Sequence, residues 1–133
     1  MKYINYFVFV LSIIFYTVSC SDDSDILSTT NETKFKMIAY KGLTDQQKES
    51  LTIQWQDAFV EQGYYQTGNC PDIVVINSNN KLCFNLKDGN TQLQLNQKLV
   101  AVSFGTKNII LSGPMIVIID PTNENVIGFV GRN

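Results

Sequence analysis

The carboxylates are the first candidates for acid–base chemistry in this chain, because the sequence of 133 residues contains no histidine. Without an imidazole, the commonest general base, nucleophile activator and zinc ligand are all missing. Asp57 and Glu61 are four residues apart and would share one face of a helix, where they could form an acid–base pair or bind a hard cation. That face would lie opposite Trp55 and Phe59, so we interpret both carboxylates as solvated surface groups.

Asp120 is the other carboxylate in a position of interest, since it ends an apolar run and precedes Pro121. It could ligate a metal, but Asp-Pro after a strand is ordinary turn chemistry, and this is the interpretation that we favour. The sequence has no glycine-rich phosphate loop, serine-centred elbow or acidic calcium loop. We therefore predict a non-catalytic protein with no cofactor and no metal site.

The three cysteines divide into one near the N-terminus and a pair in the middle of the chain. Cys70 and Cys83 lack the Cys-x-x-Cys spacing of redox sites, and we predict that they form a structural disulfide. The bond would close a loop of about 13 residues, worth about 3 kcal/mol in the chain-entropy model. If residues 73–76 and 82–86 form a hairpin, Cys83 faces residue 74 or 75, and the chain at Cys70-Pro71 has to fold back to reach it.

Residues 1–20 are typical of an export signal. A lysine stands near the start, the run from residue 4 to residue 18 is almost entirely apolar, and small residues follow at the exit. This run is short for a bilayer span of about 20 residues, and the residues after it are acidic rather than basic. We therefore predict an extracytoplasmic protein.

The exit of the signal is compatible with two processing routes. Thr17-Val18-Ser19-Cys20 resembles the lipobox of bacterial lipoproteins, in which a small residue precedes a cysteine that is acylated, although Thr17 stands where leucine is usual. The resemblance implies a lipid at Cys20 that attaches the protein to a membrane. Alternatively, a signal peptidase cuts at a small-x-small site after Ser19 or Cys20 and releases a soluble protein. The lipoprotein is our leading expectation.

The mature chain divides into an acidic tether over residues 21–33 and a single domain over residues 34–133. The tether has acidic side chains and no lysine or arginine, so we interpret it as solvated and flexible. Asn31 begins an Asn-x-Thr glycosylation sequon, which would matter only in a eukaryotic host. With a net charge of −2 and no basic stripe, the chain gives no sign of binding nucleic acid.

Alternating apolar and polar residues over 34–42 predict a strand. A helix is predicted next, from a capping box at Thr44 and Gln47 to a stop at Gly63, with Trp55 on its buried stripe. Residues 92–96 could form a strand or a short helix. Further strands are predicted at residues 72–76, 81–86, 99–104, 108–112, 115–120 and 126–130.

This order of elements predicts an α+β fold, in which one helix packs on an antiparallel or mixed sheet of about five to seven strands. The segments QGYYQTGNCPDIVVI (62–76) and IVIIDPTNENVIG (116–128) resemble parts of small α+β domains of envelope lipoproteins, such as the curli-secretion and penicillin-binding-protein-activator lipoproteins. The shared features are an aromatic-glycine helix exit, an aspartate that opens an apolar strand, and an Asp-x-Thr-like hairpin. The resemblance implies an envelope location and assigns no functional residue.

Tyr64, Tyr65 and Gln66 form the one cluster that folding does not require, in a predicted loop beside the disulfide. Tyrosine offers a large contact area at low entropy cost, so we predict that a protein partner binds here and at the sheet edges. The alternative is that one tyrosine packs over the helix end. The leading function is a lipid-anchored accessory or binding protein of the cell envelope, and the alternative is a soluble secreted effector or enzyme inhibitor.

Overall fold

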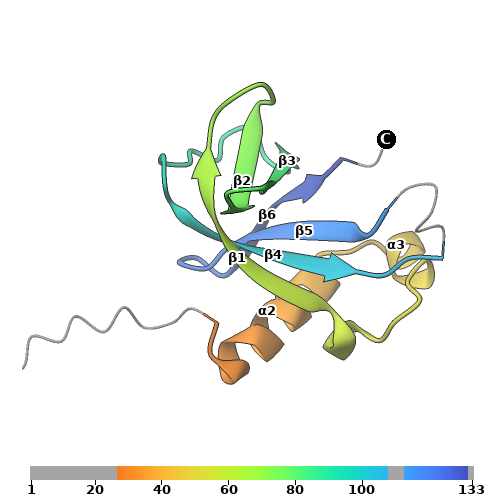
Figure 1. The fold of residues 1–133 in the computed structure, drawn as a ribbon. Coiled ribbons are helices and arrows are strands. Elements are labelled where there is room, and N and C mark those ends of the chain that lie inside the picture. Colours follow the sequence, from red (N-terminus) through yellow and green to blue (C-terminus); the bar gives the residue numbers. More distant parts are fainter. Residues whose placement is uncertain (1–26, 108–112, 132–133) are drawn as a thin grey trace, which may run out of the picture.

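The computed structural model describes residues 27–107 and 113–131, and in these ranges six antiparallel strands close into a barrel (Figure 1). Around the barrel the order is β1-β2-β3-β6-β5-β4, so that β4 returns to pair with β1. The strands are β1 (Phe59–Gln66), β2 (Asp72–Asn77), β3 (Asn80–Leu86), β4 (Lys98–Phe104), β5 (Met115–Asp120) and β6 (Asn125–Val130).

The predicted α+β fold, with a helix on a sheet, is therefore wrong. The prediction assigned residues 59–62 to a helix, whereas they begin β1, which has β4 on one side and β2 on the other. With this strand in place each of the six described strands has two neighbours, so the sheet closes and none of these strands is an open edge. The strands predicted at residues 72–76 and 81–86 form the β2–β3 hairpin, and those predicted at residues 115–120 and 126–130 form the β5–β6 hairpin.

The N-terminal part of the domain is a helix, α2 (Thr29–Lys41), and the predicted strand over residues 34–42 is wrong. Phe35 and Ala39 are buried, and their spacing of four fits one face of a helix as well as one face of a strand. Met37, which the alternation placed between them on the same face, is 37% exposed. The helix also includes residues 29–33 of the predicted tether, among them Asn31.

The predicted helix over residues 44–63 is correct only over its first five residues. The capping box of Thr44 and Gln47 is confirmed, but it begins a short helix, α3 (Asp45–Glu49), that ends at Ser50. After an irregular stretch, a 3-10 turn, η1 (Trp55–Asp57), leads into β1. The predicted buried stripe does not exist, since Phe59 is 66% exposed.

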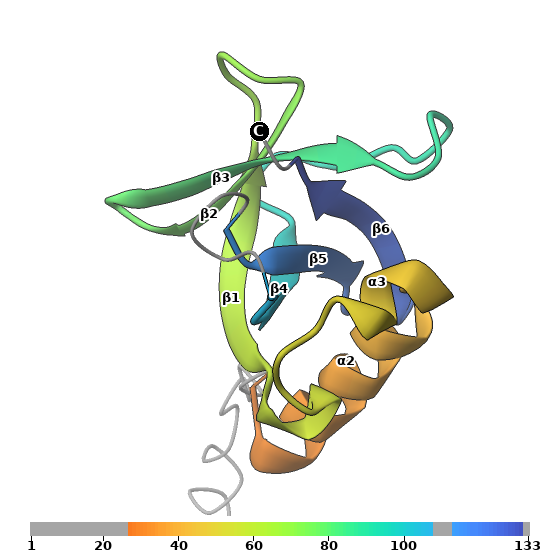
Figure 2. The same ribbon diagram turned by 90° about the vertical axis from the view of Figure 1, so that its right-hand side faces the viewer.

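Two apolar cores share the central strands β4 and β5. Alternate side chains of these strands point into the barrel and out toward α2, which packs on the outside of the barrel wall (Figure 2). Every residue of β5 is buried for this reason. The outer core includes Phe35, Ala39, Leu43, Val100, Val102, Phe104, Val117 and Ile119, and the inner core includes Tyr65, Val74, Phe84, Leu99, Ala101, Ile116, Ile118 and Ile127.

Gly63, predicted to stop a helix, instead lies inside β1 where this strand passes very close to β2. A Cβ atom at this position would lie 2.6 Å from Val74 Cγ2 and 2.8 Å from the Val75 carbonyl oxygen. A register shift between β5 and β6 at Ile118 and Ile119 marks a bulge beside Gly128. Both glycines allow neighbouring strands to approach more closely than a side chain would permit.

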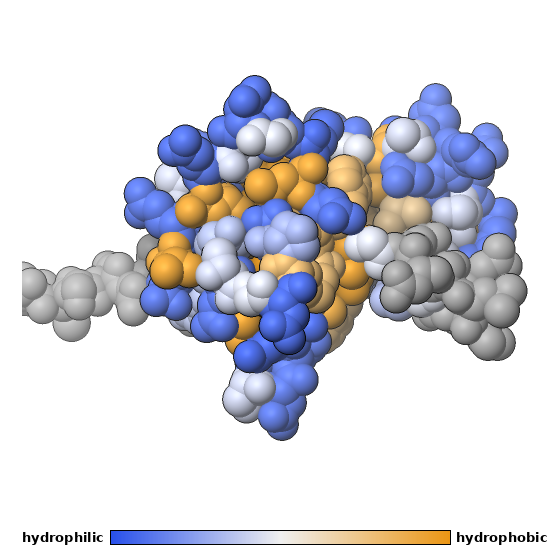
Figure 3. Space-filling view, turned by 90° about the horizontal axis from the view of Figure 1, so that it is seen from above, coloured by the Kyte–Doolittle hydropathy of each residue, from blue (hydrophilic) through white to orange (hydrophobic). Residues whose placement is uncertain are grey.

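Apolar side chains reach the surface at the end of the barrel where β2 and β3 lie, as the view from above shows (Figure 3). Ile76 and Leu82 pack against the inner core there and are only partly buried. Residues 92–96 form neither the strand nor the helix proposed for them. The predicted strand over 108–112, the signal and Cys20 lie outside the described residues. Among the described helices, none combines the length and apolarity needed to cross a membrane.

Candidate functional site

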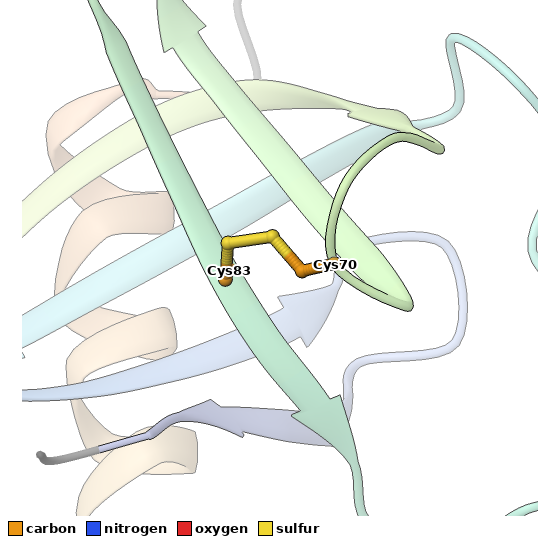
Figure 4. The surroundings of a disulfide bond; sticks show 2 residues. All are labelled: Cys70 and Cys83. Atoms are coloured by element: carbon orange, nitrogen blue, oxygen red, sulfur yellow. A yellow bond between two sulfur atoms is a disulfide. The ribbon is translucent and has the colours of Figure 1, made fainter.

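A disulfide bond joins Cys70 and Cys83, as predicted, and ties the loop that enters β2 to the middle of β3 (Figure 4). The two Cα atoms are 6.0 Å apart, which is a normal separation for a disulfide. Cys83 pairs with Ile73 rather than with residue 74 or 75. Fewer residues than expected therefore separate Cys70 from the position opposite Cys83. Cys83 is exposed and Cys70 is half-buried, so that solvent reaches the bond.

Tyr65 lies inside the barrel, at the β2 end of the inner core. Its side chain is 7% exposed, and its hydroxyl donates a 3.0 Å hydrogen bond to Oδ1 of Asp72, which is 9% exposed. The aspartate that opens β2 is therefore held by β1 directly beside the disulfide loop. Of the two tyrosines predicted to contact a partner, Tyr65 is buried and belongs to the core. It packs inside the barrel rather than over a helix end.

Replacing Tyr65 by phenylalanine is expected to lower the free energy of unfolding by about 2 kcal/mol at neutral pH, because it leaves the buried Asp72 carboxylate without its donor. Burial, the hydrogen bond to Asp72 and the charge of Asp72 raise the pKa of Tyr65 above its ordinary value of 10.0. As the pH rises past about 10, the unfolded chain therefore loses this proton while the folded chain keeps it, and the folded state loses stability.

Urea unfolding of the parent and the Tyr65→Phe variant across the alkaline range measures this effect. The difference between the two proteins should be constant up to about pH 10 and should shrink above it, because only the parent carries the buried phenol. A difference that stays the same at every pH would show that the Tyr65 proton is not linked to folding.

Tyr64 points away from the barrel interior and is 42% exposed. The segment before β4 runs beside it, since the Asn96 N–H donates to the Tyr65 carbonyl and the Tyr65 N–H donates to the Gln97 carbonyl, both at 2.9 Å. Leu95, in this segment, is 65% exposed. We call Tyr64, Gln66 and Leu95 the tyrosine patch. Leu95 was not predicted as part of it, because only the pairing of β1 with residues 96–97 brings it there.

A second aromatic surface, absent from the sequence-based predictions, lies where α2, α3 and η1 meet. The rings of Tyr40 and Trp55 stack with centroids 6.2 Å apart and an interplanar angle of 27°. The Lys48 ammonium lies over the Tyr40 ring, 5.3 Å from its centroid. These side chains border a cleft of about 310 Å³, which we call the aromatic cleft; its lining is Tyr40, Lys48, Leu51, Ile53, Gln54, Trp55 and Gln56.

Sequence patterns did not reveal the aromatic cleft, because its residues come from three separate elements that tertiary packing brings together. Tyr40 was assigned to a strand and Trp55 to the buried stripe of a long helix. The only local signal is the run Gln54-Trp55-Gln56, in which amide side chains flank the single tryptophan of the chain.

The carboxylates considered for chemistry do not form a site. Asp57 ends η1 and Glu61 lies within β1, so the proposed pair on one helix face does not exist. Asp120 makes a turn, as we favoured: Oδ1 accepts from the Thr122 N–H at 2.9 Å, and Oδ2 accepts from Asn123 Nδ2 at 2.8 Å. No group of three or more acidic or cysteine side chains that could hold a metal occurs within the described ranges.

A larger cleft of about 780 Å³ lies between the end of α2, the β3–β4 connection and the β5–β6 turn. Lys41, Lys87 and Asp88 contribute charges of both signs to its lining. Glu124, at its edge, already forms an ion pair with Lys34. This cleft therefore has no single charge or chemistry that would select a ligand.

The fold and these surfaces define a disulfide-linked antiparallel β-barrel domain with an outer helix, the tyrosine patch and the aromatic cleft. In comparisons with known proteins, no family model, no curated protein and no solved structure matches this chain. Its own residues and their geometry are thus the basis for assigning a function.

Proposed function

We propose that this protein is an exported, lipid-anchored and non-catalytic binding protein of the cell envelope, which contacts a protein partner through the tyrosine patch. The observation that carries the proposal is the Cys70–Cys83 disulfide, because such bonds form and persist in oxidising compartments outside the cytoplasm. The signal-like residues 1–20, with Cys20 at their end, support the same location.

The tyrosine patch suits a protein partner because its apolar area is exposed on a rigid support. Tyr64 pairs with Lys98 of β4 and Val75 of β2, so its backbone is held on both sides. The disulfide restrains the loop that follows Gln66. Large aromatic side chains on a preorganised backbone lose little entropy on binding, and they are common contact residues at interfaces.

The anchoring is tested by the intact mass of the mature protein from its native host, together with its distribution between membrane and soluble fractions. We expect a chain that begins at Cys20, carries acyl chains and is found in membranes, and a Cys20→Ala variant that is no longer acylated. A soluble, unacylated protein that begins at Cys20 or Ser21 would contradict the anchor and support the secreted effector or inhibitor instead.

Replacing Tyr64 by alanine is expected to weaken partner binding by about 30-fold, the loss typical of an aromatic hot spot worth about 2 kcal/mol. The partner is first captured by a photo-crosslinking amino acid placed at Gln66 in the native host. Its affinity for purified parent and variant domains is then measured by titration calorimetry.

The matched control is Asn79→Ala, in the exposed turn between β2 and β3. It should leave both the affinity and the stability unchanged. Equal affinities of the Tyr64→Ala variant and the parent would rule out the tyrosine patch as the contact surface. Unfolding curves of both variants check that a loss of binding is not a loss of fold.

A further inference from the structure

The aromatic cleft, which is separate from the tyrosine patch, has a floor that folding holds in place. Tyr40, Leu51 and Trp55 are partly buried and pack against the outer core. The ammonium of Lys36 on α2 also donates a 3.0 Å hydrogen bond to the Gln56 carbonyl, which ties η1 to α2. The rings therefore do not need to be ordered when a ligand binds, which lowers the entropy cost of binding.

The rim of the cleft is polar and open. Gln54 and Gln56 are exposed on either side of Trp55, and Ile53 is 36% exposed. Each glutamine amide both donates and accepts hydrogen bonds, so it suits a ligand whose polar groups also donate and accept. Hydroxyl groups are of this kind.

The charges near the cleft disfavour two other classes of ligand. Among the described residues that line the cleft, Lys48 is the one with a charge. It already lies over the Tyr40 ring, so an organic cation would meet both a filled site and a like charge. Asp45 is the ion-pair partner of Lys48 at 3.7 Å, but its side chain is almost fully exposed and attracts a cation only weakly. A wholly apolar ligand would offer no hydrogen bond to the two amides at the rim.

We propose that the aromatic cleft binds a sugar ring of a glycan. A pyranose has an apolar face of C–H groups, which packs on an aromatic ring, and a rim of hydroxyls, which the two glutamines and Lys48 bond. The volume of about 310 Å³ lies at the lower end of ligand sites and suits one ring of a longer chain.

Trp55 is the only tryptophan in the sequence, so its fluorescence and its indole N–H resonance report on this cleft alone. The purified domain is titrated with glucose, galactose and N-acetylglucosamine. We expect a saturable change in both signals with at least one of the three sugars, in the millimolar range. No response to any of them, or a stronger response to uridine, would overturn the assignment, and the second result would indicate a nucleobase site.

The double substitution Gln54→Ala and Gln56→Ala tests whether these two side chains bind the sugar. It leaves Trp55 and the core packing in place, whereas Trp55→Ala would remove a side chain that packs on the core. We expect sugar binding about tenfold weaker, from the loss of hydrogen bonds, and an unchanged unfolding midpoint. Gln92→Ala, an exposed glutamine elsewhere, should bind as the parent does. Equal affinity in the double variant would refute the proposed contacts.

Discussion

Replacing both disulfide cysteines, as Cys70→Ala with Cys83→Ala, should lower the free energy of unfolding by about 3 kcal/mol. The two cysteines are 13 residues apart in the chain, so the bond closes a loop. Without the bond, the unfolded chain gains the conformational freedom of that loop. A loss of this size is a large share of the total of about 5–15 kcal/mol that is typical of a small domain. The double substitution avoids the free thiol that either single change would leave.

The measurement is urea unfolding with and without dithiothreitol, since the exposure of Cys83 allows the reductant to reach the bond. Reduction should bring the parent close to the double variant and should leave the variant itself unchanged. A parent whose stability does not change on reduction, with thiols confirmed by mass, would show that the bond contributes little to folding. In that case the tyrosine patch would not depend on it either.

Replacing Gly128 by alanine is expected to cost about 3 kcal/mol, because the new methyl group has no space between β3 and β6. The added Cβ would lie 2.5 Å from the Asn85 carbonyl oxygen and 2.7 Å from Phe84 Cδ2. The first is backbone and the second belongs to a fully buried ring, so neither moves at low cost. The pairing of β3 with β6 runs only from Phe84 to Leu86 on β3, so a shift there opens the barrel.

The matched control for Gly128→Ala is Gly89→Ala, an exposed loop position where an added Cβ meets nothing within 4 Å. Thermal and urea unfolding should place this control within about 0.5 kcal/mol of the parent. Hydrogen exchange should in addition show faster exchange along β3 and β6 in the Gly128 variant. Equal stability of the two variants would mean that the strands are less closely packed than the structure shows.

The β2–β3 and β5–β6 hairpins could be predicted because their evidence is local. In each hairpin, a short apolar run is followed by turn residues and then by a second run, and no distant part of the chain is needed to form it. The capping box at Thr44 and the Asp120 turn are also local, since each is completed within three residues. The disulfide could be predicted equally well, because an even number of cysteines remains after Cys20 in an exported chain.

The N-terminal third could not be predicted in this way, because its apolar spacing fits two structures. Phe35 with Ala39, and Trp55 with Phe59, are each four residues apart, a separation that places side chains on one face of either a helix or a strand. The choice depends on β4, to which β1 pairs over its whole first half, and on the outer face of β4 and β5, which α2 covers. Both partners lie more than 30 residues away from the segments they organise.

The candidate sites also divide into features that the sequence predicts and features that only the tertiary structure decides. The composition, the signal-like leader and the cysteine pair are properties of the chain itself, and they led to export, the disulfide and the tyrosines beside it. Barrel closure alone decided that Tyr65 turns inward to Asp72 while Tyr64 remains exposed, and helix packing alone brought Tyr40 and Trp55 together. The physical reason is that a local pattern constrains neighbours in sequence, whereas burial and a cleft depend on which distant surfaces meet.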